Sequence, residues 1–256
     1  MSSIDKLILR LKAITLLRIV KQRLKYSELI KATGLDQPTL SKYFYGITVP
    51  SAKRAKQLID ALKKYINLAE EVEYALKKGL MIVPEGGSIF IKNIDLANLI
   101  AYEVYEKYKN KNVNKVLSVE NGGLLFAALI ASLLKVKLVY AARGYGFYSG
   151  NILEERYWPY RSKSDEVINP RLKQLLTLPK EAIKKDEKIL IIDDIIWSGE
   201  TLKALARFVK RLGGIIVAVF CLATVSEEIV KSLKEELNVE VEFLTSLTHS
   251  SSQRML

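Results

Sequence analysis

The segment Lys188–Thr201, KILIIDDIIWSGET, constrains the fold of this chain more than any other part of its sequence. The four apolar residues Ile189–Ile192 predict a strand that is buried on both faces, which is typical of a parallel sheet covered by helices. Two adjacent carboxylates, Asp193 and Asp194, end this predicted strand, and a glycine-containing turn then leads into a helical pattern. Because ligands of open α/β sheets bind beyond the carboxyl ends of the strands, the sequence predicts a binding site at this turn.

The turn Trp197–Thr201 has the chemistry of an anion site. Unpaired backbone N–H groups at the start of a helix bind anions, and Ser198 and Thr201 add hydroxyl donors. The carboxylates of Asp193 and Asp194 suit sugar hydroxyls or a hydrated cation instead. Together these residues predict a site for a phosphorylated or polyhydroxylated sugar derivative.

This segment resembles the phosphoribosyl-pyrophosphate motif of type I phosphoribosyltransferases. In that family the acidic pair faces the ribose hydroxyls, and the following loop wraps the 5-phosphate. The resemblance implies that the ligand contacts come from Asp193, Asp194, Trp197, Ser198, Gly199, Glu200 and Thr201. No cofactor is required, and a magnesium ion near the two aspartates would accompany only a pyrophosphate-bearing ligand. The alternative is a Rossmann-like strand that happens to end in two aspartates.

The sequence VLSVENGGLLFAALIASLLKVKLVYAARG, residues 116–144, resembles the preceding half of the same core. The resemblance implies that the turn Glu120-Asn121-Gly122-Gly123 forms the pyrophosphate loop and that Arg143 helps to hold the same group. Two interpretations of the glycine pair remain open, a tight turn or backbone exposed to a ligand. The position of the pair beyond a strand favours exposure to a ligand.

Strands and helices alternate through the rest of the chain, which predicts an α/β domain with a mostly parallel sheet. We expect strands at Lys115–Val119, Lys137–Ala142, Lys188–Asp193, Ile215–Ala223 and Val239–Leu244. We expect helices at Asp95–Lys107, Leu124–Leu134, Thr201–Leu212 and Ser226–Leu237. Residues 143–186 are rich in aromatic side chains but lack clean periodicity, so they are expected to form a lid over the pocket.

The first 65 residues carry most of the positive charge. They hold 14 Lys and Arg against 4 Asp and Glu, whereas the other 191 residues hold 26 against 24. A solvated basic face is the usual explanation for such a run. An excess confined to one segment instead indicates a polyanionic partner for the N-terminal part.

Residues 1–65 also show a helical pattern, with helices expected at Ile4–Leu24, Ser27–Thr33, Gln37–Tyr45 and Ser51–Leu62. The stretch YSELIKATGLDQPTLSKYFYG, turning at Gly34, is similar to the DNA-binding unit of repressor-type helix-turn-helix proteins. The resemblance implies that the third helix enters the major groove of double-stranded DNA. Candidate DNA contacts are Ser27, Gln37, Thr39, Ser41, Lys42 and Tyr45.

Ile30 departs from the pattern of this unit, because a small residue usually stands at its position, and it is expected to widen the crossing of the two helices. The alternative is a small helical cap on the α/β domain.

The combination resembles archaeal transcriptional regulators of the GfcR type, and also bacterial purine-operon repressors. The resemblance to the archaeal group implies three parts of the chain. These are a helix-turn-helix domain at residues 1–65, a linker helix and junction at 66–87, and an orotate-phosphoribosyltransferase-like effector domain at 88–256. The resemblance further implies a homodimer that senses a sugar or phosphosugar effector and controls genes of sugar catabolism. In the archaeal group the core is implied to be an effector domain for which catalysis is not required.

Departures from the enzyme pattern favour a sensor, so no catalytic residue is assigned. Enzymes of the family commonly have a lysine after the arginine, where this chain has Gly144, and preorganised cations stabilise a departing pyrophosphate. Trp197 stands where a small polar residue usually begins the phosphate loop, and Glu200 is compatible with a phosphate only if it turns outward. The alternative is a working orotate or purine phosphoribosyltransferase with a DNA-binding appendage.

Composition excludes several other classes of protein. Cys221 is the single cysteine and His249 the single histidine, so neither an internal disulfide nor a Cys/His zinc cluster is expected. No signal peptide is visible, and the longest apolar run, Leu124–Leu134, is too short to cross a bilayer. We therefore expect a cytoplasmic protein without a membrane partner.

Overall fold

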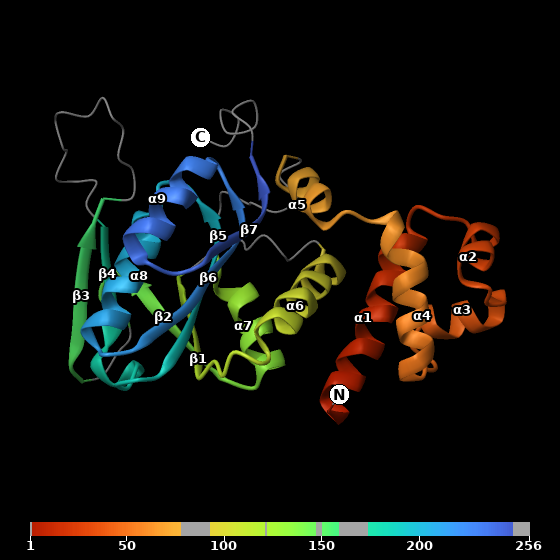
Figure 1. The fold of residues 1–256 in the computed structure, drawn as a ribbon, viewed down its shortest axis with the longest axis horizontal. Coiled ribbons are helices and arrows are strands. Elements are labelled where there is room, and N and C mark those ends of the chain that lie inside the picture. The colour runs from red at the N-terminus through yellow and green to blue at the C-terminus, as the bar shows by residue number, and fades with distance from the viewer. Residues whose placement is uncertain (1, 78–92, 121, 147–149, 159–173, 248–256) are drawn as a thin grey trace.

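A seven-stranded sheet organises the C-terminal two thirds of the chain (Figure 1). The computed structural model describes residues 2–77, 93–120, 122–146, 150–158 and 174–247. Its strands are β1 (Lys115–Val119), β2 (Lys137–Arg143), β3 (Ile152–Tyr157), β4 (Gln174–Pro179), β5 (Lys188–Ile196), β6 (Ile215–Thr224) and β7 (Val241–Ser246). They lie in the order β3-β4-β2-β1-β5-β6-β7, and those from β2 to β7 in this order are parallel. The expected mostly parallel sheet is confirmed.

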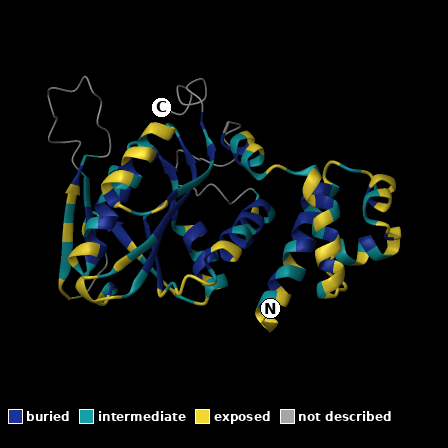
Figure 2. Cartoon of the chain, in the orientation of Figure 1, coloured by how far each residue is buried: buried dark blue, intermediate teal, exposed yellow. Residues whose placement is uncertain are grey.

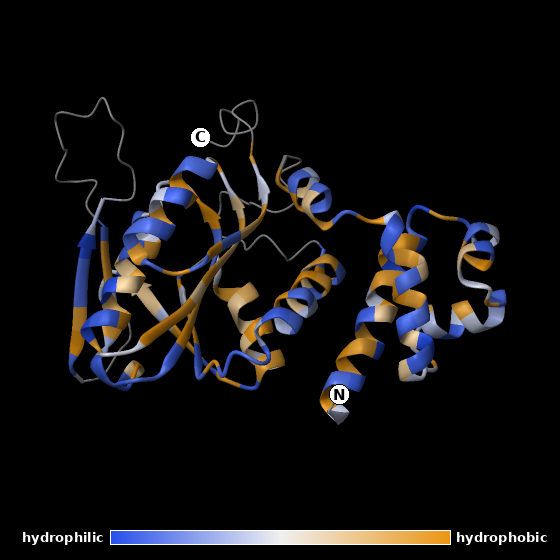
Figure 3. Ribbon diagram, viewed as in Figure 1, coloured by the Kyte–Doolittle hydropathy of each residue, from blue (hydrophilic) through white to orange (hydrophobic). Residues whose placement is uncertain are grey.

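Helices cover both faces of this sheet. On one face lie α5 (Leu68–Lys77), α6 (Ile94–Tyr108) and α7 (Leu124–Leu134), and on the other lie α8 (Glu200–Arg211) and α9 (Glu227–Leu237). The central strand β5 contributes to both cores, because Leu190 packs under the first layer of helices and Ile191 packs under the second. Figure 2 shows the sheet as largely buried and Figure 3 shows its central strands as apolar. Burial on both faces of the sheet explains why the four residues Ile189–Ile192 are all apolar.

The structure corrects the expectation for residues 143–186, which contain two strands and a short helix, η3 (Lys180–Ala182). Strand β4 pairs antiparallel with β2, placing Ala142 opposite Thr177, and β3 pairs antiparallel with β4. The alternating exposure of Glu154 and Arg156 in β3 is the pattern of an edge strand that faces water, which weakens its apolar signal. The part of the expected lid at residues 159–173 lies outside the described residues.

The N-terminal helices form a separate bundle at the end of the molecule opposite to β3 (Figure 1). They are α1 (Ser3–Lys21), α2 (Tyr26–Thr33), α3 (Gln37–Phe44), α4 (Ala52–Leu62) and the 3₁₀ turn η1 (Lys63–Tyr65). Gly34 ends α2 with a left-handed φ of +68°, and the carboxylate of Asp36 caps α3 by accepting from the N–H of Thr39 at 2.7 Å. Leu29 and Leu40 are completely buried between the helices. The expected helix-turn-helix unit is confirmed.

Two details of this unit differ from expectation. Helix α2 begins at Tyr26, one residue before the expected start at Ser27, and its cap position is Lys25. Ile30 does not separate the helices, because its side chain is 36% exposed and points away from the core. Its neighbour Leu29 fills the interior instead. Leu29, and not Ile30, is thus the residue of this pair that belongs to the N-terminal core.

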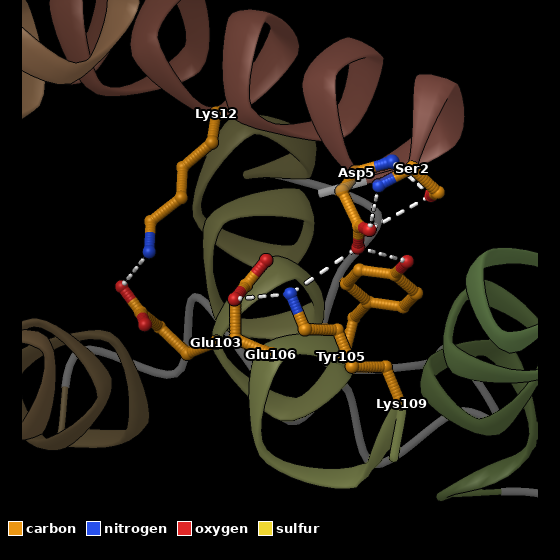
Figure 4. Close-up of polar contacts among 7 residues, drawn as sticks. All are labelled: Ser2, Asp5, Lys12, Glu103, Tyr105, Glu106 and Lys109. Carbon is orange, nitrogen blue, oxygen red and sulfur yellow. Dashed lines mark hydrogen bonds and ion pairs between the residues drawn. The ribbon is translucent and has the colours of Figure 1, made fainter.

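Helix α6 joins the N-terminal bundle to the sheet. Ile100 and Val104 on one side of α6 belong to the sheet core, whereas Leu99 is buried among the residues of the N-terminal core. Tyr102 and Tyr105 pack with Ile8 of α1. Figure 4 shows polar contacts between the same two helices, so α1 lies directly against α6. In the part of the chain that the structure describes, no helix has the length and apolar character needed to cross a membrane.

Candidate functional site

A cavity of about 210 Å³ lies beyond the carboxyl ends of the central strands, and we call it the strand-end pocket. It is lined by Arg143, Gln174, Asp193, Ile195, Ile196, Trp197, Ser198, Gly199, Thr201 and Leu202. The fold therefore brings together six of the residues implied by the sequence resemblance. Five others, Asp194, Glu200, Glu120, Gly122 and Gly123, do not line this cavity, and Asn121 lies outside the described residues.

The acidic pair lies inside β5, which continues to Ile196 instead of ending at the carboxylates. The N–H of Asp194 donates to Oδ1 of Asp193 at 2.9 Å, and the N–H of Ile195 donates to Oδ1 of Asp194 at 2.7 Å. Burial raises the pKa of both side chains, and the neighbouring charge of Asp194 adds to the rise at Asp193. Because the two adjacent carboxyl groups interact, they titrate as a coupled pair.

Gly122 and Gly123 lie directly against this pair. A Cβ atom at residue 122 would stand 2.0 Å from Oδ2 of Asp194, and one at residue 123 would stand 2.7 Å from the Cα of Asp193. Neither a tight turn nor ligand exposure is needed to explain these glycines. They let the loop after β1 approach the acidic pair more closely than any residue with a side chain could.

A hydrogen-bond network holds Arg143 at one side of the pocket. Its Nη1 donates to Tyr157 Oη at 3.1 Å and to Oε1 of Gln174, and its Nε donates to the carbonyl of Glu120 at 2.6 Å. The hydroxyl of Thr201 donates to Tyr157 Oη at 3.2 Å. Sequence reasoning missed Tyr157 and Gln174, because both lie on the two strands that it did not foresee. Their network links the predicted cation to the predicted phosphate loop.

At the start of α8, both the packing of Gly199 and the ion pair of Glu200 are directed towards α9 and not towards the pocket. Gly199 has a φ of +78°, and a Cβ atom there would lie 2.7 Å from Cδ1 of Leu233 in α9. The glycine is therefore required by backbone conformation and by packing on α9, and a larger residue would disturb the fold before it met any anion. Glu200 pairs with Lys203 at 3.0 Å, and Lys203 also reaches Glu236 of α9 at 2.7 Å. This pairing directs Glu200 away from the pocket lining.

The charge of the strand-end pocket is unusual for a pyrophosphate site. Among the described residues that line it, Arg143 is the single cation and Asp193 the single carboxylic acid. Glu120 adds another carboxylate nearby, because its Oε2 accepts from the N–H of Arg143 at 3.1 Å. In the described part of the chain, no three His, Cys, Asp or Glu side chains gather as metal ligands. Asp193 and Asp194, once ionised, are the residues that could hold a magnesium ion with its water shell.

Five of the six candidate DNA contacts lie on α3 or at its end, and Ser27 lies on α2. Gln37, Lys42 and Tyr45 are exposed, with Tyr45 67% accessible, whereas Thr39 and Ser41 are half-buried. The hydroxyl of Thr39 donates to Asp36 at 3.1 Å, so part of its hydrogen-bonding capacity serves the helix cap. Ser27 is exposed in the first turn of α2.

Two features of this surface were not foreseen. The turn after α3 exposes apolar Ile47, 70% accessible, beside Tyr45. In addition, several basic side chains of residues 1–65 are engaged elsewhere: Lys12 with Glu103, Arg18 with Asp95, Arg23 with Glu71, and Arg10 with the carbonyl of Pro50. Domain contacts thus account for part of the positive charge that the sequence assigned to a polyanion.

Comparison with known proteins defines the class. This chain belongs to the phosphoribosyl transferase domain family, whose profile matches residues 91–250. A helix-turn-helix profile matches residues 14–68, so the chain joins a helix-turn-helix domain to a phosphoribosyltransferase domain.

Proteins named adenine and xanthine phosphoribosyltransferase are among those similar to this chain. The adenine phosphoribosyltransferase of Escherichia coli O157:H7 is 30% identical over 157 residues, covering 57% of this chain and 78% of that protein. The xanthine phosphoribosyltransferase of Clostridium tetani is 30% identical over 129 residues, which span 50% of this chain and 64% of that protein. The structure of adenine phosphoribosyltransferase from Leishmania donovani has a TM-score of 0.54 at 18% identity, covering 70% of this chain and 83% of that chain. This structural likeness concerns the fold.

Proposed function

We propose that this protein is a DNA-binding transcriptional regulator whose phosphoribosyltransferase domain senses a phosphorylated or polyhydroxylated sugar metabolite. The observation that carries the proposal is the direct packing of a helix-turn-helix unit, with Gln37, Lys42 and Tyr45 exposed, on a ligand-binding fold. Control of sugar-catabolism genes by an archaeal, cytoplasmic protein is the finer form of this proposal, and it is supported by the sequence resemblance alone.

The charge of the strand-end pocket supports sensing over catalysis. Transfer of a phosphoribosyl group releases pyrophosphate, and positioned cations aimed at the departing group supply much of the rate enhancement. Among the described lining residues, Arg143 alone offers a positive charge, and it already bonds Tyr157 and Gln174. A ligand with fewer negative charges than pyrophosphate, such as a sugar monophosphate, matches this lining better.

The packing of α6 supports communication between the two sites. One side of α6 is buried in the sheet core and the other contacts α1, so a change in the sheet domain reaches the helix-turn-helix bundle through one rigid element. If ligand and DNA act on a shared equilibrium, each changes the affinity for the other by the same factor. The size of this factor sets how strongly the ligand changes the DNA affinity of the protein.

The direct test measures binding of ribose 5-phosphate by calorimetry to the full chain, with and without operator DNA selected from a random duplex library. We expect a different affinity in the two titrations, with Thr201→Val, which removes one pocket hydroxyl at constant shape, weakening both. Thr245→Val on β7, which does not line the strand-end pocket, is the matched control. Equal ligand affinities with and without DNA contradict the sensor role.

A catalytic phosphoribosyltransferase is the second candidate, because the similar proteins are enzymes that bear the names adenine and xanthine phosphoribosyltransferase. Release of pyrophosphate from phosphoribosyl pyrophosphate with adenine, xanthine or orotate, in the presence of magnesium, separates the two functions. We expect the wild-type protein to release no more pyrophosphate than the Asp193→Asn variant, which serves as the control. Turnover that this substitution abolishes establishes the enzyme instead.

The regulator is also proposed to act as a homodimer. A single helix-turn-helix makes too few base contacts for regulatory affinity, and paired units on half-sites about one helical turn apart supply the rest. Light scattering at micromolar concentration should give twice the 29.0 kDa mass of the chain. A monomer both with and without DNA contradicts this part of the proposal.

A further inference from the structure

A second cavity lies where α1, α4 and η1 meet α6, and we call it the junction cavity. Its volume is about 440 Å³, and it shares no lining residue with the strand-end pocket. Small-molecule sites in proteins usually enclose roughly 300–1,000 Å³ and often lie between domains. The junction cavity meets both conditions.

The floor of the junction cavity is apolar. It is formed by Leu16, Ile59, Ile66, Leu68 and Leu99. Leu16 of α1 and Leu99 of α6 are each only 2% exposed, so the floor continues the packed core of the N-terminal bundle. Such a floor favours a ligand with an apolar body, because burial of apolar surface is favourable.

The rim of the junction cavity is basic. It holds Lys12, Lys63, Lys64 and Asn67, and Glu103 is the single carboxylate among the lining residues that the structure describes. The ammonium group of Lys12 pairs with Glu103 at 2.8 Å across the α1–α6 contact (Figure 4), so these two charges balance.

The two remaining lysines carry the net charge of the rim. Lys63 pairs with Asp60 at 2.9 Å, but both side chains are more than half exposed, and such surface pairs contribute little. The ammonium of Lys64 lies 5.2 Å from the ring centroid of Tyr65. Both lysines therefore exchange these weak contacts readily for a ligand anion.

From this arrangement we infer that the junction cavity binds an organic anion with an apolar body, whose charged group is held by Lys63 and Lys64. The apolar part lies on the floor that includes Leu16 and Leu99. This ligand contacts α1 and α4 on one side and α6 on the other, so it acts at the joint between the helix-turn-helix bundle and the sheet domain. The inference does not depend on DNA binding or on the strand-end pocket.

The probe for this site is 8-anilinonaphthalene-1-sulfonate, an aromatic sulfonate that fluoresces when it leaves water. Titration into the full chain at neutral pH should show one site per chain. The double substitution Lys63→Met and Lys64→Met keeps the aliphatic stems and should weaken probe binding about tenfold, as expected for the loss of charge-assisted contacts. The conservative pair Lys63→Arg and Lys64→Arg should retain the affinity.

Matched controls identify the site. Lys53→Met and Lys56→Met alter two exposed lysines of α4, the helix that precedes η1. Both lie outside the cavity, and they should leave probe binding unchanged. Equal binding to the wild-type chain and to the Lys63/Lys64 methionine variant overturns the inference. Displacement of the probe by inorganic phosphate at similar concentration also overturns it, because the apolar floor would then contribute nothing. Thermal unfolding of each variant confirms that the fold is retained.

Discussion

The phenol of Tyr105 donates a hydrogen bond of 2.9 Å to Oδ1 of Asp5, which ties the first turn of α1 to the outer side of α6 (Figure 4). The same carboxylate caps its own helix, because the N–H and the hydroxyl of Ser2 donate to its Oδ2 at 2.7 Å. The ammonium group of Lys109, directly after α6, also donates to Oδ1 of Asp5 at 3.2 Å. A single side chain therefore both starts α1 and docks it on the sheet domain.

The first prediction concerns the pH dependence of this contact. Hydrogen bonds from Ser2 and Tyr105 hold the pKa of Asp5 well below its ordinary value of 3.8. A lowered pKa in the folded state means that the stabilisation is fully present above that ordinary value and is lost as the pH falls below it. Asp5→Asn should therefore destabilise the protein at pH 7 and have a smaller effect near pH 3.

Denaturant unfolding of wild type and Asp5→Asn at the two pH values checks this. Tyr105→Phe, combined with Asp5→Asn in a double-mutant cycle, separates the docking bond from the helix cap. Additive effects of the two substitutions would show that the bond across α1 and α6 contributes nothing.

The second prediction concerns DNA binding. Lys42→Ala should weaken binding to all sequences and reduce the slope of log affinity against log salt by about one phosphate contact, because Lys42 is exposed at the end of α3. Gln37→Ala, at the start of the same helix, should reduce discrimination between operator and non-operator duplexes. Fluorescence anisotropy over a salt series measures both effects.

Lys231→Ala on α9 is the control, because this exposed lysine lies on the sheet domain. Deletion of residues 1–65 is a poor control, since it would expose Leu99 and the tyrosines of α6 that pack against α1. The recognition role of α3 is excluded if Lys42→Ala and Lys231→Ala change the salt slope equally.

The third prediction concerns the close approach of Gly122 to Asp194. Gly122→Ala would place a methyl group 2.0 Å from Oδ2 of Asp194, so the loop or the strand must shift. Overpacking of this kind costs about 1–3 kcal/mol of unfolding free energy. Asp194→Ala in the same chain removes the obstructing carboxyl group and should recover much of the loss.

Chemical denaturation of the two single variants and the double variant checks this coupling. If the two costs simply add, the glycine is not required by the carboxylate, and another reason for residue 122 must be sought.

The fourth prediction is that the acidic pair reduces stability in the absence of ligand. Burial raises the pKa of Asp193 well above its ordinary value. For an acid with a raised folded-state pKa, stability is lost as the pH rises from the unfolded-state value towards the folded-state value. Asp193→Asn should therefore stabilise the free protein by about 1 kcal/mol at pH 7 and by less at pH 4, while weakening binding of ribose 5-phosphate.

Thermal unfolding at both pH values, together with ligand titration, tests this prediction. Lower stability of Asp193→Asn at pH 7 would mean that the charged carboxylate is compensated in the folded protein.

Long apolar patterns were predicted well, and close approaches between separate segments were not. Helix Leu124–Leu134 and strand Lys115–Val119 have the predicted bounds, because most of their residues are apolar. Strand β3 was missed, because its alternating Glu154 and Arg156 carry no such run. Edge strands pair through backbone groups, which leave little trace in side-chain chemistry.

In the candidate site, too, local motifs could be predicted and contacts between distant residues could not. Six residues that line the pocket were identified from local motifs, but the reasons for Gly122, Gly123 and Gly199 were not. Each of these glycines faces a residue far away in sequence, Asp194, Asp193 or Leu233, and such contacts exist only in the folded chain. Tyr157 was likewise assigned to a lid, whereas it bridges Arg143 and Thr201.

Helix α6 also limits how freely this architecture can be recombined. Its inner residues must match the sheet core, while Leu99, Tyr102 and Tyr105 must match α1, so one helix satisfies two partners at once. A chimera that places these N-terminal helices on another phosphoribosyltransferase domain would leave apolar side chains of α1 and α4 without their counterpart. Transfer of the three outward residues together with the N-terminal helices is therefore the smallest exchange that preserves both cores.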